Sequence, residues 1–228
     1  LKEIVFNKEF NSYEVKHVQE LVEKHNWIFG EQYNLITSAE PDFELALKGM
    51  IKAETGMEEE IHIEHPDKNK EMDIYMLRQD RQGKVTENVV VELKRPKIKL
   101  GEKELSQVKK YMRVIKDTPR FNAGNVKWTF YLVGNEFDKS HYISGELESH
   151  KHLGEQHLVH CQDDGLTKIY VLKWSEIFDD YSKRHDFLME HLKLEEKLWL
   201  ETHESADEAV TDVKNNSATL SEAVIPKN

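Results

Sequence analysis

Three residues near the middle of the chain have the types and the spacing that metal-assisted phosphate chemistry needs. Glu92 and Lys94 lie two positions apart in the apolar run ENVVVELK at residues 87–94. Strand residues two apart point to the same face, so we expect both side chains to project together, about 6.6 Å apart along the strand. Burying a carboxylate and an ammonium is costly, so another interaction must offset that cost.

Asp73 belongs to the alternating segment MDIYMLRQ, one turn before the run that contains Glu92. An antiparallel hairpin would bring the two carboxylates side by side, where they repel unless one is protonated or a cation lies between them. Hard oxygen ligands select Mg²⁺ or Mn²⁺. We therefore expect Asp73, Glu92 and the main-chain carbonyl of Leu93 to hold one of these ions. Lys94 would orient or help deprotonate the attacking water and neutralise phosphate charge.

A basic strip follows Lys94. The net charge of −11 by itself argues against generic nucleic-acid binding, but residues 94–120 hold ten Lys and Arg residues against three acids. We expect the strip to track a phosphate backbone without reading sequence, because no base-reading element such as a helix-turn-helix appears. The residues expected to bind the substrate are Arg95, Lys97, Lys99 and Lys110. A solvated helix face with ordinary charge scatter is the alternative interpretation.

Hydrophobic periodicity predicts an α/β fold with a mixed central sheet flanked by helices. We expect a helical lead-in at 1–40, a main domain at 41–201 and a disordered polar tail at 202–228. The predicted helices are 13–25, 42–53, 102–116 and a long one that follows an N-cap at Ser175. The predicted strands are 60–65, 72–79, 87–94, 126–134 and 168–174. Residues 27–36 read as a loop, and the polar segment 141–167 matches no clear element.

The spacing of the charged residues resembles the PD-(D/E)XK nuclease superfamily. Asp73, followed about twenty residues later by Glu92, Leu93 and Lys94 on a hydrophobic strand, has the arrangement of that superfamily. Met72 stands where the superfamily usually has proline. The resemblance implies a restriction-endonuclease-like fold and Mg²⁺-dependent hydrolysis of DNA. It also predicts that Lys94→Ala abolishes cleavage and leaves folding and DNA binding largely intact.

The next helix extends this resemblance. Gln107 and Tyr111 are four positions apart in the predicted helix 102–116, so they share one helix face. This spacing resembles the RecB-like and lambda-exonuclease-like branch, in which the pair helps to place the metal site and the DNA backbone. Members often carry a further acidic residue on a helix before the first strand, for which Glu44 and then Asp42 are the candidates. The resemblance thus implies catalytic roles for Gln107, Tyr111 and Glu44.

A narrower resemblance covers roughly residues 13–200. The segments WIFGEQYNL and VVVELKRPKIKL, with ELSQVKKYM after them, resemble the C-terminal nuclease domain of Shedu anti-phage defence proteins. This resemblance implies an enzyme that cuts invading phage DNA. It also implies a homo-oligomer, of which a tetramer is the typical form.

Other functions remain open from the residues alone. Glu92 and Lys94 could form an ordinary salt bridge in a catalytically inactive nucleic-acid-binding or oligomeric assembly module with the same fold. A protein-interaction domain that uses its acidic helices and tail is a second alternative. The segment 141–161 contains five histidines and Cys161, but their spacing matches no familiar zinc pattern. We expect a solvated loop there.

The hydrophobic pattern and the cysteine content indicate in which cellular compartment the protein is expected. No run of about 18 apolar residues occurs, so no membrane span is expected, and no signal peptide opens the chain. Cys161 is the single cysteine, which excludes an internal disulfide framework and fits a reducing cytoplasm. The chain starts with Leu1 rather than methionine, as expected of a fragment or a processed form.

Overall fold

The structure is a computed structural model, and it describes residues 5–6, 15–30, 34–38, 43–56, 62–63, 73–79, 86–122 and 126–202. The chain divides into two compact units, Leu1–Asp179 and Asp180–Asn228. The predicted polar tail lies outside the described residues beyond Thr202. In the part of the chain that the structure describes, no helix is long and apolar enough to cross a membrane.

A mixed sheet forms the centre of the first unit. Its six described strands follow the order β1-β2-β3-β5-β8-β7. These strands are β1 (Asn34–Ser38), β2 (Ile74–Gln79), β3 (Thr86–Leu93), β5 (Val126–Gly134), β7 (Leu158–Gln162) and β8 (Thr167–Lys173). Neighbours β1, β2 and β3 are antiparallel, β3, β5 and β8 run parallel, and β7 is antiparallel to β8. Two short strands, β4 (Lys99–Leu100) and β6 (Glu136–Phe137), pair in parallel beside this sheet.

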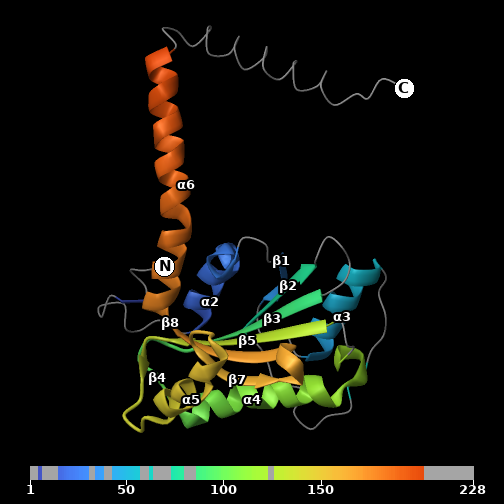
Figure 1. Cartoon of the computed structure of the whole chain (residues 1–228). Coiled ribbons are helices and arrows are strands. Elements are labelled where there is room, and N and C mark those ends of the chain that lie inside the picture. The colour runs from blue at the N-terminus through green and yellow to red at the C-terminus, as the bar shows by residue number, and fades with distance from the viewer. Residues whose placement is uncertain are drawn as a thin grey trace. The chain divides into compact units, whose positions relative to one another are not determined.

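Helices cover both faces of the sheet, so the predicted α/β class with a mixed central sheet is confirmed. The α-helices whose bounds lie within the described residues are α2 (Val15–Lys24), α3 (Phe43–Thr55), α4 (Glu102–Asp117), α5 (Tyr142–His150) and α6 (Trp174–Thr202). Short 3₁₀ turns are η2 (Asn26–Phe29), η3 (Pro119–Asn122), η4 (Lys151–Leu153) and η5 (Asp163–Gly165). Residues of α2 and of the start of α6 pack in one core cluster, and those of α3, α4 and α5 pack in the other (Figure 1).

Alternation along β3 assigns its residues to these two clusters. Val89, Val91 and Leu93 belong to the cluster that contains α2, whereas Val90 belongs to the one that contains α4. Successive strand residues point to opposite faces, so Glu92 shares the α4 face with Val90. The apolar residues on both sides explain why 87–94 is hydrophobic almost throughout, as expected for a strand with both faces covered.

Two predictions near the N-terminal half were wrong or incomplete. Residues 34–38 form β1, although the sequence predicts a loop through 27–36, because Leu35 pairs with Met76 at the edge of the sheet. Of the predicted strand 60–65, the structure describes only His62 and Ile63, which are not in a strand.

Two further corrections concern the C-terminal part of the sheet. The segment 141–161, expected to be a solvated loop, contains α5 and most of β7. The long helix begins at Trp174, so Ser175 is not its N-cap. Instead, the Glu176 carboxylate accepts a hydrogen bond of 2.6 Å from the N–H of Lys173. A glutamate in the first turn can reach back in this way and satisfy a main-chain donor.

Candidate active site

Asp73 is held at the point where β2 begins, next to the end of β3. Ile74 lies opposite Val91 in the antiparallel register, so Asp73 comes next to the end of the partner strand. Its carboxylate Oδ2 accepts a hydrogen bond of 2.6 Å from the N–H of Leu93. Its main-chain carbonyl accepts one of 2.9 Å from Nε2 of Gln19, a buried residue of α2. Side chain and main chain of Asp73 are therefore both anchored.

Glu92 is the buried centre of a hydrogen-bonded group. Its side chain is only 6% exposed, and Nζ of Lys94 lies 2.5 Å from its Oε1. Gln107 Nε2 donates to the same oxygen at 2.7 Å, and the Tyr111 hydroxyl donates to Oε2 at 2.9 Å. Three donors thus compensate a carboxylate that water hardly reaches.

Gln107 connects the members of this group to one another. Its Oε1 accepts a hydrogen bond of 2.8 Å from Lys94 Nζ, and its Nε2 also donates to the Tyr111 hydroxyl at 2.6 Å. Gln107 and Tyr111 lie one turn apart on α4, so a single helix face supplies both groups. We call Asp73, Glu92, Lys94, Gln107 and Tyr111 the β3–α4 cluster.

The electrostatics of the cluster keep the Tyr111 hydroxyl protonated. Burial raises the pKa of Tyr111, and the negative charge of Glu92 raises it further. The charge of Asp73 acts on this pKa in the same direction, so both carboxylates influence one hydroxyl. Tyr111 is therefore a hydrogen-bond donor to Glu92 and not a base at ordinary pH.

The donor set fits a hard divalent cation. A carboxylate offers about four acceptor positions, and the three hydrogen bonds that Glu92 accepts leave room for one further contact. Mg²⁺ usually takes one or two carboxylates and keeps several waters, so Asp73, Glu92 and the Leu93 carbonyl are the right kind of ligands. Within the described residues, no three or more His, Cys, Asp or Glu side chains gather as a metal-binding group. A cation here would therefore depend on main-chain and water oxygens as well.

Glu44, the predicted extra acid on α3, is engaged elsewhere. Its Oε1 accepts a hydrogen bond of 3.0 Å from the N–H of Ile63 and lies 3.1 Å from Nδ1 of His62. These contacts hold Glu44 against the segment after α3. Its catalytic role remains a prediction.

The four predicted substrate-binding residues occupy two different places. Arg95 and Lys97 are exposed in the loop after β3, and Lys99 on β4 forms an ion pair of 2.8 Å with Glu136. Lys110 lies on α4, on the side that carries Gln107. The basic strip is therefore divided between a loop and a helix face.

A pocket of about 290 Å³ opens on α4 beside the cluster. Among the described residues, those that line it are Lys103, Ser106, Gln107, Lys110 and Tyr111. Two of these residues are members of the β3–α4 cluster, so the cluster forms one wall of the pocket. Lys103, Ser106 and Lys110 are exposed and lie at the outside.

The histidine-rich segment is folded but forms no zinc site among the residues described. His150 Nδ1 contacts the carbonyl of Glu146, and His152 Nδ1 contacts the carbonyl of Ser149, each at 2.9 Å. Burial lowers the pKa of His160, which keeps this side chain neutral near pH 7. No three potential ligands come together in the described part of the segment.

Ser106 and Gln19 were not predicted at the site from the sequence, and Lys103 was predicted only as a member of the basic strip. Lys103 lies four positions before Gln107, and Ser106 lies four positions before Lys110, so helical periodicity alone could have placed them on the same face. Gln19 could not be found in this way, because it lies 54 positions from Asp73. Its only local signal is a polar residue beside the apolar stripe of the predicted helix 13–25.

Comparison with known families relates the segment that carries this cluster to restriction enzymes. Residues 51–132 match the family described as Type I restriction enzyme R protein N terminus. The matched segment is a little over a third of the chain and extends from α3 into β5, so it includes the whole β3–α4 cluster but not Glu44. Comparisons with curated proteins and with solved structures gave no match.

Proposed function

We propose that this chain is a metal-dependent nuclease that hydrolyses phosphodiester bonds in DNA. The observation that carries the proposal is the β3–α4 cluster, in which a buried carboxylate, an amine and an amide are bonded together next to a second carboxylate. The match of the surrounding segment to a restriction-enzyme domain supports it. The mixed sheet flanked by helices is compatible with a restriction-endonuclease-like fold.

Asp73, Glu92 and the Leu93 carbonyl would hold Mg²⁺ or Mn²⁺. Such an ion, when bound, supplies positive charge that stabilises the negative charge developing on a phosphate during attack. The protein contributes fixed ligand positions, because hydrogen bonds already hold both carboxylates in place before any ion arrives.

Lys94 would orient the attacking water and neutralise charge on the scissile phosphate. Gln107 would position this amine, since its Oε1 accepts from Nζ while its Nε2 holds Glu92. Tyr111 would keep the second oxygen of Glu92 in place as a protonated donor. Such positioning is worth several kcal/mol in catalysis.

The proposed substrate, compartment and oligomeric state are inferred from the resemblance to Shedu proteins. We propose that the substrate is invading phage DNA, that the enzyme acts in the cytoplasm and that it works as a homo-oligomer. Binding would be mostly independent of sequence, because basic residues rather than base-reading elements surround the cluster.

Incubation of linear and circular DNA with Mg²⁺, Mn²⁺ or EDTA tests the nuclease. We expect cleavage with either ion and none with EDTA. Asp73→Asn should weaken Mn²⁺ binding, measured by titration calorimetry, at least tenfold, because it removes a charged ligand. Asp179→Asn, at an exposed position with the same change of charge, is the matched control and should bind Mn²⁺ like the wild type. Unchanged Mn²⁺ affinity in Asp73→Asn would exclude this residue as a ligand.

A catalytically inactive nucleic-acid-binding or assembly module is the second candidate. The observation that favours it is that Lys94 already compensates Glu92, and that the described residues provide no group of three acidic or imidazole ligands. This module would bind DNA with the same affinity in EDTA and in Mn²⁺, and it would leave DNA uncut under every condition above.

A further inference from the structure

We propose that the pocket on α4 binds a phosphate group of the nucleic-acid strand, adjacent to the phosphate that reacts at the β3–α4 cluster. Lys103, Lys110 and Ser106 would be its ligands. The identity of the ligand rests on the proposed function, and the binding site itself rests on the geometry and charge of α4.

The described residues that line the pocket form a single stripe on α4. Residues 103, 106, 107, 110 and 111 recur at spacings of three and four, so all five side chains project to the same side of α4. Tyr111 is buried and Gln107 is half-buried, whereas Lys103, Ser106 and Lys110 are exposed. The pocket is therefore basic at its mouth and is closed at its base by residues that touch Glu92.

The hydrogen-bond donors of the two inner residues, Gln107 and Tyr111, are already used within the β3–α4 cluster. Gln107 Nε2 donates to Glu92 and Tyr111, and the Tyr111 hydroxyl donates to Glu92. Among the described lining residues, Lys103, Lys110 and the hydroxyl of Ser106 are therefore the groups that can hold a ligand in the pocket. Two ammonium groups and a hydroxyl are all donors, so they suit an anion rich in acceptor oxygens such as phosphate.

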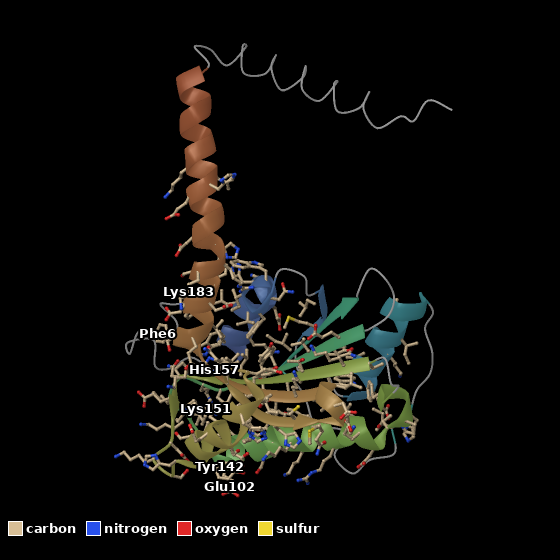
Figure 2. The ribbon with its side chains drawn as sticks, viewed as in Figure 1. Phe6, Glu102, Tyr142, Lys151, His157 and Lys183 are labelled. Atoms are coloured by element: carbon tan, nitrogen blue, oxygen red, sulfur yellow. The ribbon has the colours of Figure 1, made fainter. Side chains whose placement is uncertain are left out.

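Two lysines, Lys103 and Lys110, give the pocket side of α4 its positive charge. Within the described part of the chain, neither Lys103 nor Lys110 forms an ion pair. Acidic groups lie toward α5 instead: Glu102 acts electrostatically on Tyr142 at the start of α5, and these two labelled residues lie together in Figure 2. Glu146 of α5 lies 3.8 Å from Lys109, on that same side. The two sides of α4 thus differ in pairing, because Lys109 and Lys116 on the other side face the acids Glu146 and Asp163.

The size of the pocket limits the ligand. A volume of about 290 Å³ is at the small end of ligand pockets, which usually measure about 300–1,000 Å³. It suits one phosphate with part of its sugar rather than a protein surface. Because the cluster forms the inner wall, a strand whose phosphate occupies the pocket would bring a neighbouring phosphate to Lys94. The phosphate could be an internal diester or a terminal monoester.

Salt-dependent DNA binding tests the site. The variant is Lys103→Gln/Lys110→Gln. Its affinity for internally labelled single-stranded DNA is measured in EDTA by fluorescence anisotropy. Both positions are exposed on a helix and glutamine is a good helix former, so we expect normal folding. The matched control is Lys139→Gln/Lys151→Gln, which removes the same charge at exposed positions outside the pocket.

We expect the slope of log K against log salt to fall in magnitude by about 1.4, roughly 0.7 for each lost phosphate contact on a single strand. Affinity at low salt should fall roughly tenfold. The control should keep the wild-type slope. Ser106→Asp, which adds a negative charge and retains both lysines, should weaken binding at least as much.

Three single-stranded DNA substrates distinguish an internal phosphodiester from a terminal phosphate. If an internal diester occupies the pocket, the double variant loses affinity equally for 5′-phosphorylated, 5′-hydroxyl and circular strands. If a terminal monoester occupies it, the loss appears only with the phosphorylated strand. A wild-type slope in the double variant, or an equal loss in the control, would overturn the phosphate site.

Cleavage assays on the same preparations separate this proposal from the proposed function. Wild-type cleavage together with an unchanged slope in the double variant rejects the pocket and retains the nuclease. A reduced slope with no cleavage by the wild type retains the phosphate site and rejects the nuclease. If the wild type neither binds nor cleaves DNA, both proposals fail.

Discussion

Glu92 carries the main energetic cost of the site. A carboxylate that is 6% exposed loses most of its hydration, and in this protein three donors replace the lost water. Lys94, whose side chain is 15% exposed, is the one that also neutralises the charge. Removing one member of such a pair is more costly than replacing both, because the remaining charge stays buried without compensation.

This pairing revises the expected effect of Lys94→Ala. The sequence motif predicts lost cleavage with unchanged folding, whereas the structure predicts lost cleavage together with a destabilisation on the order of 3 kcal/mol. The double variant Glu92→Gln/Lys94→Gln removes both charges and should recover most of that stability while remaining inactive. Urea unfolding and a DNA cleavage assay on both variants and the wild type measure these effects. Cleavage by Lys94→Ala at the wild-type rate would remove Lys94 from the mechanism.

At the scale of elements, the position of α4 decides whether Gln107 and Tyr111 reach Glu92. The start of α4 is set by the chain just before it, where the carbonyl of Leu100 accepts a hydrogen bond of 2.9 Å from the N–H of Asp138. Leu100 is fully buried, and a Cβ placed on Gly134 would lie 2.7 Å from its Cδ2. Gly134 therefore allows β4 to pack closely on the end of β5.

Gly134→Ala should disturb this packing. The added methyl group overlaps buried Leu100, so we expect a loss of about 1–3 kcal/mol in stability and a fall in cleavage as α4 shifts. Leu100→Val should be less costly in the Gly134→Ala background than in the wild type, since valine lacks Cδ2, the atom closest to the added methyl group. Thermal unfolding of the two single variants and the double variant measures this coupling.

Gly145→Ala is the control for that substitution. Gly145 lies on α5, and a Cβ there would meet no atom within 4 Å. Alanine should stabilise the helix by about 0.5–1 kcal/mol, because it reduces the entropy of the unfolded chain. A gain in stability from Gly134→Ala would contradict the proposed close packing.

At the scale of the whole molecule, two tyrosines with raised pKa values make stability depend on alkaline pH. Burial raises the pKa of Tyr111 above the ordinary value of 10.0, with Glu92 adding to the effect. Burial also raises the pKa of Tyr170, and its hydrogen bond to Glu155 acts in the same direction. These tyrosines belong to separate hydrogen-bonded groups, so their effects should be additive.

Stability should decrease as pH rises above 10. The unfolded chain releases the tyrosine protons near the ordinary pKa of 10.0, whereas the folded chain retains them, so proton release favours unfolding in this range. Below pH 10 the folded and the unfolded chain both keep the tyrosine protons, so the full contribution of these tyrosines to the free energy of unfolding is present. Urea unfolding between about pH 9 and about pH 11 should show a decline that is shallower in Tyr111→Phe and in Tyr170→Phe, and shallowest in the double variant. If stability declined as steeply in the double variant as in the wild type, the two tyrosines would not be the cause of the decline.

Much of the fold could be predicted because periodicity is local. The apolar face of 102–116 and the apolar run at 126–134 reproduce α4 and β5 closely. Strand β1 was missed because an edge strand of five residues has little periodic signal of its own and depends on pairing with β2. The segment that contains α5 was missed because its helix is polar on most sides.

The sequence by itself determined which pairs of side chains share a face: Glu92 with Lys94 on a strand, and Gln107 with Tyr111 on a helix. Covalent geometry makes these two relations independent of the rest of the molecule. Only the tertiary structure decided that α4 lies over β3, so that the two pairs meet, and that Gln19 anchors Asp73 from 54 positions away. Contacts over such separations depend on how sheet and helices pack, and that packing is set by the burial of apolar surface across the whole unit.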